Sequence, residues 1–114
     1  YTSSANLGAA TTAYSSSNEV TNSSGAAYSA GGKALTSPTV TLSGTTAFVD
    51  FADVSWTSAS FTANGALIYR HDGGAPTDDA VVVLAFGGDF TASNGTFTIQ
   101  FPAAGGGSEI IRLG

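Results

Sequence analysis

The chain of 114 residues is long enough for one domain and no more. Only 10% of its residues are charged, against about 25% in typical domains, and its formal net charge is −5. Its three basic residues, Lys33, Arg70 and Arg112, cannot form the basic patch that nucleic acids or anionic membranes require. The absence of cysteine excludes disulfides, thiol nucleophiles and Cys-based zinc sites. A surface this poor in long charged side chains loses little when it is covered, which favours a protein that works in contact with other proteins.

The first part of the chain, residues 1–31, is dominated by Ala, Ser, Thr, Gly and Asn and has no helical periodicity. We expect an extended arm or long loop here, with a short strand near residues 18–21. A segment of this composition buries too little apolar surface to offset the cost of ordering it, so we expect a neighbouring molecule to hold it. Its removal is expected to leave a folded antiparallel β domain, residues 32–114, that no longer docks.

The rest of the chain alternates apolar and polar residues with a period of two, which predicts strands. In chain order, the predicted strands span residues 39–42, 45–51, 55–57, 60–62, 66–70, 80–86, 96–101 and 109–113. A hairpin turn is predicted at Ser43-Gly44, and further turns at Asn64-Gly65 and Asn94-Gly95. Six or more short strands without a helix predict an all-β fold, an antiparallel β-sandwich or small barrel with an extended N-terminal arm.

Two of these strands, residues 66–70 and 80–86, are near-continuous apolar runs, and we expect them to be central and buried on both faces. The glycine-rich stretches 87–89 and 105–107 do not open a helix, so they predict turns or bulges rather than a phosphate site. The large aromatic residues are expected to form the core because they recur at strand spacing. They are Trp56, Phe61, Phe86, Phe97 and Phe101.

The only histidine, His71, lies in a predicted polar loop, residues 71–79, with Asp72, Asp78 and Asp79. Such oxygen-rich loops can hold Ca²⁺, but the spacing does not fit a calcium-binding EF-hand loop. A solvated loop is the favoured interpretation, with cation binding left open. No Gly-x-Ser-x-Gly motif accompanies the histidine, so a serine-based triad is not favoured either. We therefore predict no catalytic residue, no metal and no cofactor, and a protein that is not an enzyme.

Two further features suggest carbohydrate chemistry. Asp50 and Asp53 are close in sequence, and paired carboxylates perform glycoside hydrolysis. We favour the interpretation that both acids lie at the end of a strand and face solvent or a neighbour. Exposed rings of Trp56, Tyr69 or Tyr28 would instead suit a carbohydrate-binding module, which remains an alternative from another functional class.

Many short stretches of the chain, in the same order, resemble a family of small virion proteins of tailed bacteriophages. The stretches are residues 1–5, 12–14, 18–20, 28–35, 56–63, 65–69, 84–89, 95–101 and 110–112. Members of this family usually have a further segment before the Tyr-Thr-Ser-Ser stretch, ending in an apolar strand. The resemblance therefore implies that a segment precedes Tyr1. It brings no catalytic residue.

The resemblance implies a structural component encoded among head and tail genes. We expect a capsid decoration, or cement, protein that bridges major capsid subunits on the outer surface of the phage head. We also expect it to be a homo-oligomer, a trimer or dimer, with no nucleic acid and no membrane as partner. A tail, baseplate or fibre component is the alternative, in which case the protein would be located in the phage tail.

Overall fold

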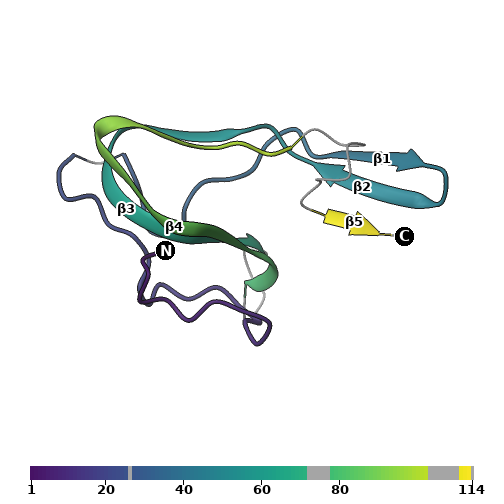
Figure 1. Ribbon diagram of the computed structural model, residues 1–114, viewed down its shortest axis with the longest axis horizontal. Coiled ribbons are helices and arrows are strands. Elements are labelled where there is room, and N and C mark those ends of the chain that lie inside the picture. The colour runs from purple at the N-terminus through teal and green to yellow at the C-terminus, as the bar shows by residue number, and fades with distance from the viewer. Residues whose placement is uncertain (26, 72–77, 103–110, 114) are drawn as a thin grey trace.

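The computed structural model describes residues 1–25, 27–71, 78–102 and 111–113. The five strands are β1 (Thr39–Ser43), β2 (Thr46–Asp50), β3 (Val54–Arg70), β4 (Asp79–Ile99) and β5 (Ile111–Leu113). They form one antiparallel sheet in the order β1-β2-β5 and a second antiparallel sheet of β3 and β4 (Figure 1). The described residues contain no helix, so the predicted all-β antiparallel class is confirmed. It follows that no described helix is long and apolar enough to cross a membrane.

Neither sheet closes on itself over the described residues, so the small-barrel alternative is wrong. A barrel needs its first and last strands to pair. Here β1 pairs only with β2, and β3 and β4 pair only with each other among the described strands. The short hairpin formed by β1 and β2 is as predicted, with its turn at Gly44 and Thr45, one residue beyond the expected position.

The expected series of short strands is instead two long ones, of 17 and 21 residues. Both predicted turns, Asn64-Gly65 and Asn94-Gly95, lie inside these strands, so the turn predictions are wrong. Their residues form bulges, because the pairing shifts register there and Asn94 has a positive φ of 49°. A left-handed residue can kink a strand as readily as it can reverse the chain.

A larger bulge lies in β4, where residues 86–89 stand opposite Asn64 alone. Gly87 has a φ of 80° there, so the predicted irregularity at residues 87–89 is confirmed. Gly65 is required on the opposite strand, because a Cβ at that position would lie 2.7 Å from the Leu84 carbonyl oxygen. These interruptions let the β3–β4 ribbon bend back on itself into a U (Figure 1).

Because the ribbon bends and has only two strands, the apolar runs 66–70 and 80–86 are less buried than expected. All residues of the runs 66–70 and 80–86 are half-buried or exposed, so the expectation of central strands buried on both faces is wrong. A two-stranded ribbon has no third strand to make either run central. The N-terminal segment and the other half of the U enclose only part of its inner face, which borders an open hollow.

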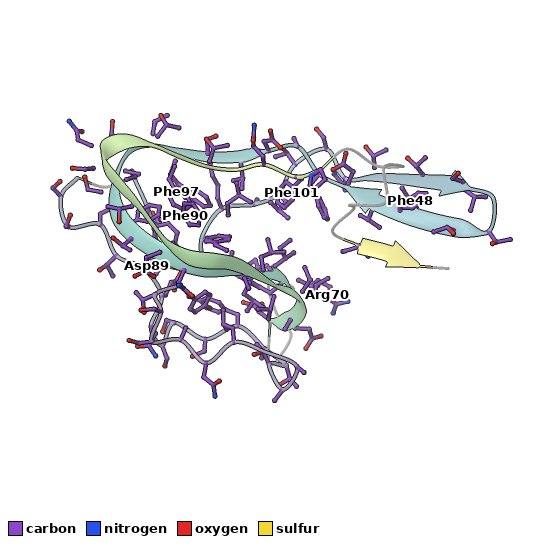
Figure 2. All side chains as sticks on the ribbon, viewed as in Figure 1. Phe48, Arg70, Asp89, Phe90, Phe97 and Phe101 are labelled. Carbon is purple, nitrogen blue, oxygen red and sulfur yellow. The ribbon has the colours of Figure 1, made fainter. Side chains whose placement is uncertain are left out.

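The core lies inside the U and is small. Its buried residues are Val20, Ala59, Phe61 and Ala63. Of the predicted core aromatics, Phe61 is buried, and Trp56, Phe86 and Phe97 are half-buried against it. Phe101 lies apart from this cluster, at the junction of the two sheets, with its ring centroid 6.0 Å from that of Phe51 (Figure 2).

The N-terminal segment, residues 1–31, folds back against β3 of its own chain. The Ser23 amide donates to the Ser60 carbonyl at 2.8 Å, and the Asn64 amide donates to the Tyr1 carbonyl at 2.8 Å. The short strand expected near residues 18–21 is absent, because Asn18 takes a left-handed turn conformation with a φ of 61°. Two other expectations, the glycine break at 105–107 and the start of the last strand at 109–110, lie outside the described residues.

Val20 of the N-terminal segment is 5% exposed and belongs to the buried cluster, so the segment contributes to the core. The expectation that residues 32–114 keep their fold without this segment stays a prediction. We expect Val20→Ala to lower the free energy of unfolding by about 2 kcal/mol through lost burial and a cavity. Urea denaturation measures this change. Val81→Ala is the matched control, because Val81 is 53% exposed and its truncation should cost less than about 0.5 kcal/mol. Equal effects at the two positions would contradict the packing of the segment.

Candidate functional site

An open hollow of about 720 Å³ occupies the inside of the U. Its walls come from the N-terminal segment, β3 and β4, and they are mainly apolar and aromatic. Phe97 points into this space from β4 (Figure 2). The Trp56 and Phe61 rings meet edge to face at 6.4 Å, and Phe61 lies 4.9 Å from Phe97. Tyr28 of the N-terminal segment completes this aromatic cluster, with its ring edge to face with Phe61 at 5.6 Å.

Glu19 is the polar centre of this region. Its carboxylate accepts hydrogen bonds from the Tyr14 hydroxyl at 2.7 Å, the Tyr28 hydroxyl at 2.5 Å and the Gly31 amide at 2.7 Å. Three donors converge on one carboxylate that is itself only half-exposed, so Glu19 ties together separate parts of the N-terminal segment.

A second group of contacts fastens this network to the ribbon. The Tyr14 ring stacks on Tyr69 of β3 with centroids 4.7 Å apart. The Tyr69 hydroxyl donates to the Gly31 carbonyl at 2.7 Å. The Tyr14 amide also donates to the Asp78 carbonyl at 2.8 Å, beside the start of β4. Tyr69 therefore links the middle of the N-terminal segment, at Tyr14, and its end, at Gly31, to β3.

The tyrosines act here as protonated donors. Burial, then the hydrogen bond to Glu19 and its negative charge, raise the pKa values of Tyr14 and Tyr28 well above the usual value of 10. Burial first, and then the charges of Asp78 and Glu19, also raise the pKa of Tyr69. A carboxylate saturated by donors and phenols that resist ionisation suit structural attachment, not proton transfer at neutral pH.

A second buried polar residue, Ser60, fixes the bulge at Asn94. Ser60 is 7% exposed, and its hydroxyl accepts from the Asn94 amide at 3.0 Å. The Ser60 carbonyl accepts from the amide and the hydroxyl of Ser23, at 2.8 and 3.0 Å, and the Ser24 hydroxyl lies 3.3 Å from the Ser60 hydroxyl. β3, β4 and the N-terminal segment therefore meet at this residue.

The predicted polar loop, residues 71–79, is described only at residues 71, 78 and 79. Nδ1 of His71 lies 3.1 Å from Oδ1 of Asp78, with the histidine side chain 75% exposed. Asp79 begins β4 and forms an isolated bridge with Ala13, whereas Asp72 lies outside the described residues. No group of three potential metal ligands occurs among the residues that the structure describes.

The paired acids Asp50 and Asp53 serve the backbone. Oδ1 of Asp50 accepts from the Phe51 amide at 2.8 Å, and Oδ1 of Asp53 accepts from the Phe101 amide at 2.8 Å. Asp50 ends β2 and Asp53 immediately precedes β3, as expected for residues at strand ends. Each carboxylate fixes a chain connection between the two sheets.

The three rings considered for carbohydrate stacking are all half-buried. Trp56 packs on Phe61 and Phe97, Tyr28 is tied to Glu19, and Tyr69 is covered on one face by Tyr14. They line one hollow but do not form the exposed flat platform that stacking on a sugar needs.

The most exposed large apolar side chains lie elsewhere, on β1. Val40 is 74% exposed and Leu42 is 71% exposed, and the two point to the same face because they are two residues apart. Their cross-strand partners Val49 and Ala47 are only half-buried. This face, Val40, Leu42, Ala47 and Val49, is called the hairpin face below. The sequence predicts the strands of this face but not its exposure; the signal that could have indicated it is the absence of any charged residue from 34 to 49.

Comparison of the chain with family models, curated proteins and solved structures finds no match. The hairpin face and the network around Glu19 are therefore interpreted from their own geometry.

We expect Glu19→Ala to lower the free energy of unfolding by about 2 kcal/mol, because it leaves two hydroxyls and an amide without their acceptor. Asp89→Ala is the matched control: Asp89 is exposed and accepts one hydrogen bond, from Asn64 at 2.9 Å, so its loss should cost less than about 0.5 kcal/mol. Urea denaturation of both variants gives the comparison, and a similar small effect for both would rule out Glu19 as the centre of the network.

Stability should fall as the pH rises above 10. In that range tyrosines of the unfolded chain ionise, while Tyr14 and Tyr28 stay protonated in the folded chain. The folded state then binds more protons, so the free energy of unfolding decreases with pH, and the contribution is complete only below pH 10. Urea denaturation at pH 9, 10 and 11 measures the slope. The double variant Tyr14→Phe/Tyr28→Phe should have a shallower slope, and an unchanged slope would refute this assignment.

Proposed function

We propose that the chain is a non-catalytic structural protein of a tailed phage particle. Its role is that of a capsid decoration protein that bridges major capsid subunits on the outer surface of the head. The observation that carries this proposal is the hairpin face, where Val40 and Leu42 are open to solvent on a hairpin that stands away from the U (Figure 1). The resemblance to small virion proteins supplies the kind of particle.

The exposed apolar residues support docking on a protein surface. Burying apolar area contributes roughly 25 cal/mol per Å², and Val40 and Leu42 have about three-quarters of theirs still to bury. No charge from residue 34 to residue 49 has to be stripped of water at the same time. On a capsid, many copies bind one lattice, so that weak individual contacts reinforce one another.

The engagement of the polar residues supports the absence of catalysis. Glu19, Asp50 and Asp53 accept hydrogen bonds that hold the fold, and His71 is a solvent-exposed partner of Asp78. Glu19 and His71 line the hollow, but the Glu19 carboxylate is already occupied by three hydrogen-bond donors. The acidic net charge also suits the outer surface, away from packaged DNA.

The finer architecture belongs to this proposal. In the assembled particle the two sheets pack as an open sandwich, and residues 1–31 contact a capsid subunit as an arm. The exposed Ser and Thr side chains of this segment make that contact while Val20 and Tyr28 keep their places in the core. Copies of the chain also associate with one another, as a dimer or trimer.

The test is recruitment to heads of the encoding phage that lack this chain. We expect the purified protein to cosediment with such heads in many copies, and Leu42→Lys to bind at least tenfold more weakly because it places a charge in the apolar contact. Val81→Lys puts the same charge at an exposed valine of β4 and should bind normally. Recovery on tails in a few copies would favour the tail alternative, and no recovery on either would refute a virion role.

A further inference from the structure

The outer edge of the three-stranded sheet is unusually open. Among the strands that the structure describes, β1 is the outermost strand of that sheet, and all five of its residues are exposed. An edge strand presents unpaired backbone groups that can accept another strand. Proteins usually protect such edges with charged side chains, bulges or a covering segment. β1 pairs with β2 in unbroken register and carries no charged residue, so it has neither of the first two protections.

The chain also exposes more surface than a compact protein of its mass. It exposes 6842 Å² and has a radius of gyration of 14.8 Å. A compact folded protein of 11.3 kDa exposes roughly 5,700 Å², and a domain of this length has a radius of gyration of roughly 13 Å. The difference of roughly 1,100 Å² is spread over the whole chain, and it is larger than the roughly 800 Å² that each partner buries in a standard stable interface.

We propose that two copies of the chain pair antiparallel along β1, about a two-fold axis at Thr41. The sequence Thr39-Val40-Thr41-Leu42-Ser43 alternates hydroxyl and apolar residues symmetrically about its centre. In this register Val40 lies opposite Leu42 of the second copy. Thr39 lies opposite Ser43 of the second copy, so apolar meets apolar and hydroxyl meets hydroxyl. The product is a continuous six-stranded sheet.

The pattern favours a second copy over another partner. A chain with a net charge of −5 repels its own copies, so a self-contact has to avoid its acids. Asp50 pairs with Thr39, at the end of β1, and therefore lies away from the two-fold axis. The edge has no charge to select a basic or acidic partner. The symmetric order of its side chains matches an antiparallel copy of itself.

Single cysteines test this register, because the chain has no cysteine of its own. Thr41→Cys brings two thiols together across the axis, where Cα atoms of an antiparallel pair lie about 4.5–5.5 Å apart, within disulfide range. Under mild oxidation with copper–phenanthroline we expect a disulfide-linked dimer at least ten times more abundant than for Thr96→Cys, an exposed control on β4. A yield equal to that of the control would overturn the proposal.

A mixture of two variants tests the register itself. Thr39→Cys and Ser43→Cys should each remain largely monomeric when oxidised alone, because like residues lie about 14 Å apart in this pairing. Oxidised together they should form a mixed dimer. Efficient linkage of Thr39→Cys alone would overturn the register. Sedimentation velocity of the unmodified chain should show a concentration-dependent dimer that Leu42→Lys weakens and Val81→Lys preserves; a monomer at every concentration would also overturn the proposal.

This pairing deepens the self-association included in the proposed function, and it rests on that part alone. All of the cross-linking uses purified chain without heads. Cross-linking without recruitment to heads would refute the capsid role and leave the dimer intact. Recruitment without cross-linking would refute the dimer and leave the capsid role intact.

Discussion

A ribbon of only two strands cannot enclose a core, and this constraint explains most of the molecule. Isolated two-stranded hairpins are marginally stable in water. Here the β3–β4 ribbon bends into a U, and the N-terminal segment supplies Val20 and Tyr28 to the apolar space inside it. The Tyr28–Glu19 bond fixes the shape of that segment, and the Tyr69 hydroxyl of β3 holds it in place through the Gly31 carbonyl, 38 residues away in the sequence. A segment that reads as a loose arm is thus a structural part of the core.

The sequence was sufficient for the class of fold and for the β1–β2 hairpin, because period-two alternation and a Gly turn are local signals. It was insufficient for the length of β3 and β4. Asn-Gly pairs favour left-handed backbone, and that conformation serves a bulge as well as a turn. Which of the two forms depends on whether the partner strand continues, as β4 does opposite Asn64. That information is not local.

For the candidate site, too, some features could be predicted from the sequence and others could not. The placement of Asp50 and Asp53 at strand ends could be predicted, because both flank period-two runs in the sequence. The role of Glu19 could not be predicted, because its three donors come together only when the N-terminal segment folds back on itself. The exposure of Val40 and Leu42 was hidden for a related reason: alternation marks an apolar face but does not say whether a second layer covers it.

The attachment of the N-terminal segment to β3 has a consequence for synthesis of the protein. Residues 1–31 leave the ribosome before β3 and β4, so Val20 cannot pack into the core until Phe61 has emerged, and the Tyr14 amide cannot reach the Asp78 carbonyl until later still. Contacts of such sequence separation form slowly, because a long loop must close before they are made. Until β3 and β4 have been synthesised, a segment rich in Ser, Thr, Asn and Gly stays hydrated and exposes little apolar surface through which nascent chains could aggregate. The same polar composition that suggested an unattached arm therefore protects the chain until its binding strand has been made.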